Sequence, residues 1–176
     1  MRAAVAAALA LTAVFTGTAH ADVSYDRDGY EGKYEERWHG QTWGAATGGI
    51  ETDEVNAYKG SNNGWLYARS GGAAAHSRQF VVNNWTTRTN CFARVWANPE
   101  SRTADVGLQV WNPNTTPNWT IVVSKSQKVA AGDYGQIVAG PFNLTNIGSV
   151  FVQGIYGDGT AQGQVVRLDE FELECG

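Results

Sequence analysis

The chain has 176 residues, enough for one domain with a full hydrophobic core. Its 13 Lys and Arg residues are outnumbered by 17 Asp and Glu residues, a formal net charge of −4. This balance argues against nucleic-acid partners and anionic membrane surfaces, because both require a basic stripe on the protein. The composition also includes 21 glycines and 7 tryptophans, and the tryptophan count is high for a chain of this length.

The first 21 residues have the features of a secretory signal peptide. Arg2 supplies a positive start, residues 3–17 are uncharged and mostly apolar, and Ala19-His20-Ala21 is an A-x-A cleavage signal. No later run approaches the roughly 20 apolar residues of a membrane-spanning helix. We therefore expect cleavage before Asp22, an exported extracellular product with no membrane attachment, and a single domain over residues 22–176.

After the leader, short alternating segments predict an all-β fold. Residues 22–49 mix charges, aromatics and glycines without a clean period, which predicts an opening strand and a long loop. From Ile50 onward, turn-forming stretches such as 60–64 and 112–117 separate segments of period two. The expected strands are 51–59, 65–70, 77–82, 91–97, 105–111, 118–124, 134–139, 149–156 and 164–174. Together they predict an antiparallel two-sheet β-sandwich of the jelly-roll type.

The two cysteines, Cys91 and Cys175, both follow the leader. Two cysteines in an exported protein most often pair, and this bond would tie the last strand to a central one. In the chain-entropy model such a long closed loop stabilises the fold by roughly 3–5 kcal/mol. The alternative is two buried thiols.

The stretch from Asn90 to Trp111 is predicted to form two strands joined by a short turn. Its residues alternate between an apolar face and a mixed face that carries Arg94, Trp96, Gln109 and Trp111. Aromatic rings stack on the C–H side of a pyranose, and Arg and Gln side chains bond sugar hydroxyls. We therefore predict that these four residues bind a neutral poly- or oligosaccharide. Gln153 and Tyr156, on the expected 149–156 strand, are weaker candidates. The alternative for each tryptophan is burial in the core.

Three segments resemble the β-jelly-roll carbohydrate-binding modules of secreted bacterial glycanases, such as families 4 and 22. They are VNAYKGSNNGWLYARS, CFARVWA and VVRLDEFEL, in that order along residues 50–175. A departure occurs in DYGQIVAGPFNL, where such modules usually carry a Trp-Thr pair and this chain has Tyr134-Gly135. The resemblance implies a sugar lying across the concave sheet. It also implies a structural calcium at the opposite edge, with Asp169 as a ligand and with Glu170, Glu54 or backbone carbonyls near Lys59 and Gly60 completing the shell.

Two other classes of function stay open at this point. A secreted protein-binding or inhibitor domain would use the loops instead of the sheet face. A small glycoside hydrolase would need two carboxylates about 5 to 9 Å apart. The chain has two acidic runs, Glu51 to Glu54 and Asp169 to Glu174, and alternation would place Glu170, Glu172 and Glu174 on one face unless a bulge intervenes. A serine triad is not indicated, because the chain contains no G-x-S-x-G.

Overall fold

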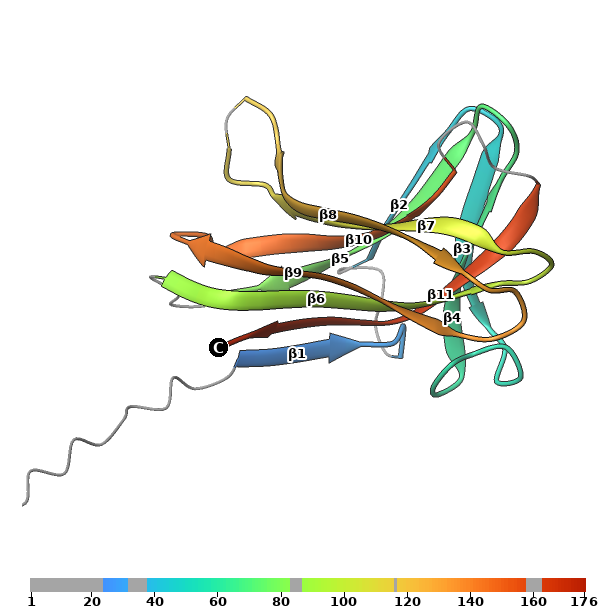
Figure 1. Cartoon of the computed structure of the whole chain (residues 1–176), viewed down its shortest axis with the longest axis horizontal. Coiled ribbons are helices and arrows are strands. Elements are labelled where there is room, and N and C mark those ends of the chain that lie inside the picture. The colour runs from blue at the N-terminus through green and yellow to red at the C-terminus, as the bar shows by residue number, and fades with distance from the viewer. Residues whose placement is uncertain (1–23, 32–37, 83–86, 116, 158–162) are drawn as a thin grey trace, which may run out of the picture.

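The computed structural model describes residues 24–31, 38–82, 87–115, 117–157 and 163–176. The predicted signal peptide over residues 1–21 lies outside these ranges. The described residues form eleven strands and no helix, arranged as two antiparallel sheets (Figure 1). This confirms the predicted all-β sandwich. Within the described ranges, no helix is long and apolar enough to cross a membrane.

The first sheet, here called sheet A, has its strands in the order β3-β4-β11-β6-β9. These strands are β3 (Ala46–Thr52), β4 (Asn62–Ala68), β11 (Gln164–Cys175), β6 (Thr87–Pro99) and β9 (Gly135–Thr145). Strand β1 (Ser24–Asp28) also pairs with β11, along its second half, whereas β4 pairs along its first half. The closing strand β11 therefore holds sheet A together.

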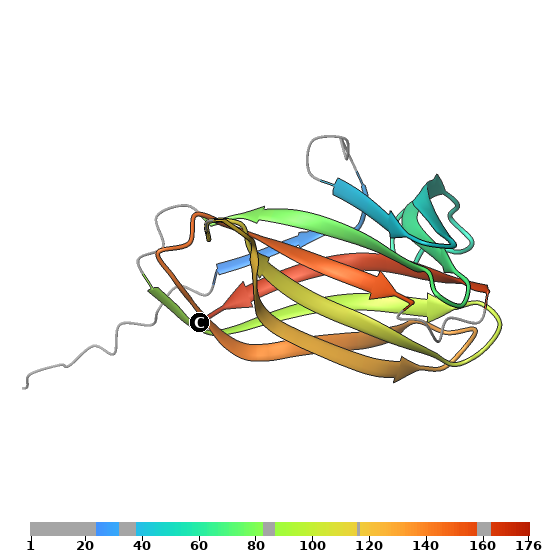
Figure 2. The same cartoon turned by 90° about the horizontal axis from the view of Figure 1, so that it is seen from above.

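The second sheet, sheet B, has the order β2-β5-β10-β7-β8. Its strands are β2 (Trp38–Trp43), β5 (Ala73–Val81), β10 (Ser149–Tyr156), β7 (Ala104–Asn112) and β8 (Thr120–Val129). Seen from above, the long strands of both sheets run side by side along the molecule (Figure 2). Strand β10 is the central strand of sheet B.

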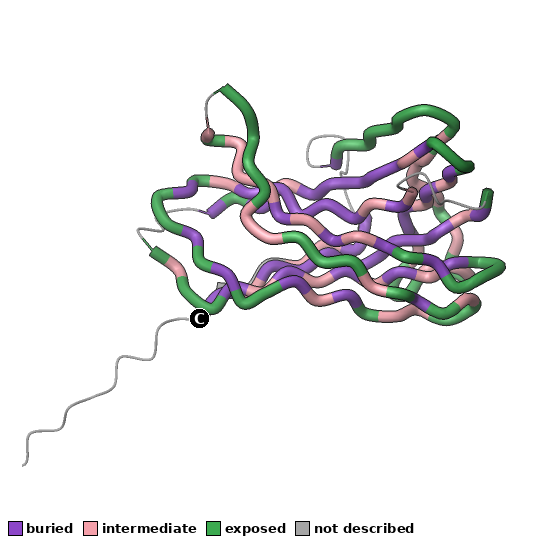
Figure 3. The backbone as a smooth tube through the Cα atoms, turned by 45° about the horizontal axis from the view of Figure 1, so that its top comes forward, coloured by how far each residue is buried: buried purple, intermediate pink, exposed green. Residues whose placement is uncertain are grey.

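The core lies between the two sheets and follows the predicted alternation. In β7, Val106, Leu108 and Val110 are fully buried, while the residues between them point outward. Val95 in β6 and Leu168 in β11 meet them from sheet A, also without exposure. Figure 3 shows buried residues running along the strands of both sheets. Because successive strand residues point to opposite faces, this burial leaves the other half of each strand for the outer surface.

The segment from Asp22 to Gly49 differs from its prediction. Instead of one opening strand and a long loop, its described residues include β1, β2 and the first part of β3. Tyr30 and Trp38 stack with ring centroids 3.9 Å apart and cover the edge of the core. Gly40, Gly48 and Gly49 lie within these strands, because strand pairing with β5 and β4 overrides local propensity.

The disulfide between Cys91 and Cys175 is present, and both cysteines are fully buried. It joins β6 to the end of β11, which are neighbours in sheet A. The predicted connection between the last strand and a central strand is confirmed.

Strand β11 contains a β-bulge between Asp169 and Glu172. Glu170 has a φ of 48°, and Phe171 turns into the core with no exposure. The extra residue changes which side chains share a face. The condition for an uninterrupted alternation of Glu170, Glu172 and Glu174, that no bulge intervenes, is therefore not met. Glu170 and Glu172 nevertheless share Arg27, and Glu172 and Glu174 share Arg94, so the three carboxylates lie on one side of sheet A.

Candidate cleft on the outer face of sheet B

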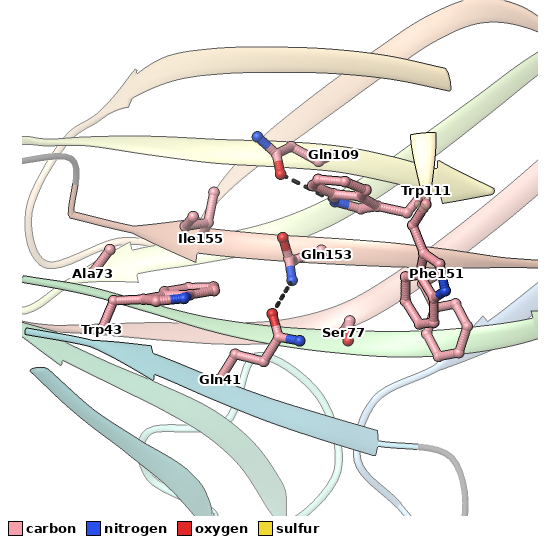
Figure 4. Close-up of a pocket in the computed structure, with 10 residues that line it drawn as sticks. Gln41, Trp43, Ala73, Ser77, Gln109, Trp111, Phe151, Gln153 and Ile155 are labelled. Carbon is pink, nitrogen blue, oxygen red and sulfur yellow. Dashed lines mark hydrogen bonds between the residues drawn. The ribbon is translucent and has the colours of Figure 1, made fainter. Parts of the chain in front are cut away.

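The outer face of sheet B has connections between strands at both of its ends. In Figure 1 the β7–β8 connection rises above the sheet at one end, and the β2–β3 and β4–β5 turns rise at the other. A cleft with a volume of about 420 Å³ lies on this face. Strands β2, β5, β10 and β7 supply most of its wall and floor (Figure 4). The lining residues are Gln41, Trp43, Ala73, Ser77, Gln109, Trp111, Trp119, Phe151, Gln153 and Ile155.

Strand register sets the order of side chains across this floor. Gln109 on β7 pairs with Gln153 on β10, and Gln153 pairs in turn with Ser77 on β5. Two residues along the same strands, Trp111 pairs with Phe151. Side chains two residues apart on a strand share a face, so an amide row and an aromatic row lie next to each other.

Aromatic rings form one end of the cleft. Trp119, just before β8, stacks on Phe151 with ring centroids 4.6 Å apart and an angle of 24° between the planes. The Trp111 indole donates a hydrogen bond from Nε1 to Oε1 of Gln109 at 3.1 Å. Trp119 remains 48% exposed, so it presents ring surface to a ligand. A ring that is both held in place and open to solvent is suited to stacking.

The polar groups of the cleft are amides and a hydroxyl. Gln153 is only 6% exposed, and its Nε2 donates to Oε1 of Gln41 at 3.4 Å. The Ser77 hydroxyl donates to the backbone carbonyl of His39 at 3.3 Å. Among the described residues that line the cleft, none is ionisable. Such a surface offers hydrogen bonds in both directions and no net charge.

Three of the sequence-predicted residues, Gln109, Trp111 and Gln153, meet in this cleft. The structure does not bring Arg94 and Trp96 to them. Those two residues lie on β6, which pairs with β11 and β9, whereas Gln109 and Trp111 lie on β7, which pairs with β10 and β8. The two predicted strands and their short connection are present, but the prediction that they share one mixed face is wrong. The connection over residues 100–103 crosses from sheet A to sheet B, and the two polar faces point away from each other.

Arg94 and Trp96 are engaged on the outer face of sheet A. The Arg94 guanidinium lies 2.6 Å from the Glu174 carboxylate. Tyr58 stacks on Trp96 with centroids 5.3 Å apart, and the Arg27 guanidinium lies 5.7 Å from the centroid of the Trp96 ring. These contacts occupy the guanidinium of Arg94 and the ring of Trp96, the groups predicted to bind a sugar.

Tyr156 lies on the other face of β10 from Gln153. It is 4% exposed and belongs to the hydrophobic core between the sheets. The alternation of β10 explains this placement, since residues 153 and 156 fall on opposite faces of one strand.

Sequence reasoning missed several cleft residues, notably Gln41 and Trp43 on β2, and Trp119. A signal for β2 exists, because His39, Gln41 and Trp43 alternate with Trp38, Gly40 and Thr42. Trp38 is the one buried residue of this strand, and His39, Gln41 and Trp43 fall on the opposite face from it. The neighbouring glycines weaken this strand pattern in the sequence, and the strand is identified only from its pairing with β5 in the structure.

The acidic runs lie outside the cleft. Glu170 and Glu172 both pair with Arg27, on sheet A. Glu51 pairs with Arg167, also on sheet A. These carboxylates are neutralised by arginines and do not face the aromatic cleft.

Asp169 is fully buried beside the β11 bulge. Its Oδ2 accepts hydrogen bonds from the backbone N–H groups of Tyr58 at 2.8 Å and Lys59 at 3.1 Å, and its Oδ1 accepts one from Glu170 at 2.7 Å. Burial raises the pKa of this carboxyl to about 7, against the effect of the two bonds from Tyr58 and Lys59, and the nearby Glu31 raises it further. In the described ranges no group of three or more His, Cys, Asp or Glu side chains is arranged to hold a metal.

Solved structures share this fold at low sequence identity. TmCBM61 in complex with β-1,4-galactotriose gives a TM-score of 0.55 at 15% identity, covering 83% of this chain and 93% of that chain. The CBM22-1 xylan-binding domain of Paenibacillus barcinonensis Xyn10C gives 0.56 at 14% identity, covering 85% and 92%. The family 11 carbohydrate-binding module of Clostridium thermocellum, in complex with a β-1,3-1,4-mixed-linked tetrasaccharide, gives 0.55 at 8% identity, covering 84% and 94%.

These likenesses establish the fold, and the predicted resemblance to β-jelly-roll carbohydrate-binding modules is confirmed at that level. Some matches are segments of larger enzymes. The match to the arabinose-bound α-L-arabinofuranosidase MgGH51, for example, covers 23% of the enzyme's chain. The sequence matches no protein-family model, and a search of curated proteins finds no match either.

Proposed function

We propose that the cleft on sheet B binds an uncharged poly- or oligosaccharide without cleaving it. The observation that carries this proposal is the lining of the cleft, which combines aromatic rings with three glutamines and has no ionisable group among its described residues. Rings stack on the apolar faces of sugars, amides bond the hydroxyls, and the absence of charge avoids desolvating an ion. The ligands of the structural neighbours, β-1,4-galactotriose and a mixed-linked tetrasaccharide, support the choice of ligand class.

Retention on glycans tests this proposal. The protein, expressed from residue 22, is incubated with a panel of insoluble and soluble glycans, and release of reducing ends is measured in the same samples. We expect retention on at least one uncharged glycan without release. Release of reducing ends would identify a glycoside hydrolase. Absence of retention on the whole panel would overturn the proposal in favour of a protein partner bound through the loops.

We also propose that the protein is exported and acts outside the cell. The features of residues 1–21 support this, as does the disulfide between Cys91 and Cys175, because such bonds persist in oxidising compartments. Amino-terminal sequencing of secreted protein tests it, with Asp22 expected as the first residue. Accumulation of the uncleaved chain inside the cell would contradict it.

The calcium implied by the family resemblance is proposed to lie beside Asp169. Carboxylate oxygens suit a hard cation, and Asp169 and Glu31 repel each other. Glu31 also lines a polar hollow together with Asp28, Gly29, Glu170 and the cations Arg27 and Lys59. Two carboxylates are too few, so backbone carbonyls would complete the shell. Bound calcium would neutralise the cluster and stabilise the fold.

Thermal unfolding with and without calcium tests that site. We expect EDTA to lower the melting temperature by several degrees and added Ca²⁺ to restore it, because a ligand of the folded state stabilises it. Asp169→Asn should abolish the response to Ca²⁺. A melting temperature that is indifferent to both additions would contradict the calcium proposal and leave the sugar cleft unaffected.

A further inference from the structure

We propose that Trp43 is a second stacking platform and that a sugar chain lies obliquely along the strands of sheet B. The chain would run from Trp43 to the aromatic cluster of Trp111, Phe151 and Trp119. This inference rests on the proposed binding function and adds the direction and length of the ligand.

The strand register places the two aromatic ends far apart. Trp43 on β2 pairs with Ala73 at the start of β5. Further along β5, Gln79 pairs with Phe151, which in turn pairs with Trp111. The rise of about 3.3 Å per residue separates Ala73 from Gln79 by about 20 Å along the strand, and three strand-to-strand steps of about 4.8 Å separate β2 from β7. The line joining the two ends is therefore oblique.

Both ends present open ring surface to one continuous cleft. Trp43 and Trp119 are each 48% exposed, and both line the same cleft. Figure 4 shows Trp43 at one end of the view and Trp111 and Phe151 at the other, with Gln41 and Gln153 between them. A ligand that contacts both ends therefore passes over hydrogen-bonding amides.

The floor between the ends is low. Ile155 packs against Gly107 of the neighbouring strand so closely that a Cβ on Gly107 would lie 2.5 Å from Ile155 Cγ2. Because Gly107 has no side chain, the Ile155 side chain occupies the space that a side chain at position 107 would fill. Ala73 supplies a second small side chain beside Trp43. A sugar chain has room to lie along this line.

A chain lying straight across the strands would contact different residues. It would follow the row of Gln109, Gln153, Ser77 and His39, which register places in line. At the end of that row the His39 ring packs against Phe151, with centroids 5.4 Å apart. Trp43 lies off this row and would make no contact. Trp43 and His39 therefore distinguish the two directions.

Isothermal titration with ligands of increasing length tests the oblique path. Xylo-oligosaccharides and mixed-linked β-1,3-1,4-gluco-oligosaccharides, from di- to hexasaccharides, are titrated into the wild type and into Trp43→Ala, Trp43→Phe and His39→Ala. In the series that binds, we expect Trp43→Ala to weaken hexasaccharide binding about tenfold or more and to leave disaccharide binding unchanged. Trp43→Phe should restore most of the loss, and His39→Ala should change little.

Two results would overturn the inference while the binding function stands. One is a hexasaccharide affinity that Trp43→Ala leaves unchanged, and the other is an equal loss for short and long ligands. In contrast, a wild type that binds neither series and is retained on no glycan of the panel overturns the proposed function and this inference together. A wild type that is retained on another glycan is titrated with the oligosaccharides of that glycan. Circular dichroism and melting of each variant verify the fold. If Trp43→Ala does not fold, the affinity of Trp43→Phe for the hexasaccharide still tests the stacking platform. A smaller ring predicts a partial loss of affinity that is confined to the longer ligands.

Discussion

The two outer faces of the sandwich carry similar residue types and use them differently. On sheet A, Trp96 is stacked by Tyr58 and approached by Arg27, and Arg94 is paired with Glu174. On sheet B, Trp43 and Trp119 keep half of their surface exposed in a cleft. A tryptophan on an outer strand face therefore indicates binding only when no other side chain of the protein covers its ring.

The difference follows from charge. Sheet A places arginines and carboxylates on neighbouring strands, for example Arg27, Glu172 and Arg94 in cross-strand register. These groups satisfy one another and stabilise the sheet. The cleft on sheet B has amides instead, which bind one another weakly and remain available for an external ligand. We therefore expect the outer face of sheet A to contribute stability and the outer face of sheet B to bind the proposed ligand.

Replacing one tryptophan on each face tests the comparison most strongly. Trp111→Ala should weaken binding to a retained glycan by about 30-fold or more, the loss typical of a residue that dominates an interface. Trp96→Ala should leave that affinity within about twofold but lower the free energy of unfolding, because Tyr58 loses its stacking partner. Titration calorimetry and urea denaturation of both variants measure these effects. A reversed pattern would show that sheet A holds the ligand.

Removing the shared carboxylate of sheet A should cost stability without affecting binding. Glu172 is 6% exposed and lies 3.3 Å from Arg27 and 3.9 Å from Arg94. Glu172→Gln should lower the free energy of unfolding by about 1–3 kcal/mol, less than for a fully buried pair because Arg27 is partly exposed. Urea denaturation measures it, with Gln109→Ala on the other face as the matched control. Equal losses in the two variants would contradict the division of roles.

Asp169 should make stability depend on pH. Burial raises its folded pKa to about 7, above the value of about 3.9 in an unfolded chain, so the folded state holds this proton more tightly. Its contribution to stability is fully present below about pH 4 and is lost as the pH rises through 7. The measurement is the free energy of unfolding of the wild type and of Asp169→Asn, with EDTA present. The difference, wild type minus variant, should decrease as the pH rises from 4 to 7. A difference that stays constant, or rises, would contradict the raised pKa.

Salt should produce the smallest effect, and only on one face. With no ionisable group among the described lining residues, glycan affinity should change by less than about twofold when ionic strength rises from 50 to 500 mM. Stability should change measurably, since the sheet A pairs are partly exposed to screening. Calorimetry at several salt concentrations measures the first quantity. A steep decline in affinity with salt would indicate a charged ligand or a binding site on sheet A.

Local patterns were sufficient to predict much of the fold. The period of two in residues 91–97 and 106–111 predicted both strands and the residues that each buries, because that period belongs to the backbone itself. The presence of two cysteines in a chain with the features of an exported protein predicted the disulfide between them. Gln109, Trp111 and Gln153 were predicted as candidate site residues, and they meet in one cleft because β7 and β10 are hydrogen-bonded neighbours.

What the sequence determined by itself was thus the all-β class, the inward and outward faces of most strands, and a set of candidate residues. Only the tertiary structure decided that β6 and β7 belong to different sheets, which separated Arg94 and Trp96 from Trp111. It also decided that β2 brings Gln41 and Trp43 to the cleft and that a bulge at Glu170 breaks the alternation of β11. The physical reason is that side-chain alternation is a property of one strand, whereas pairing depends on contacts between residues distant in the chain.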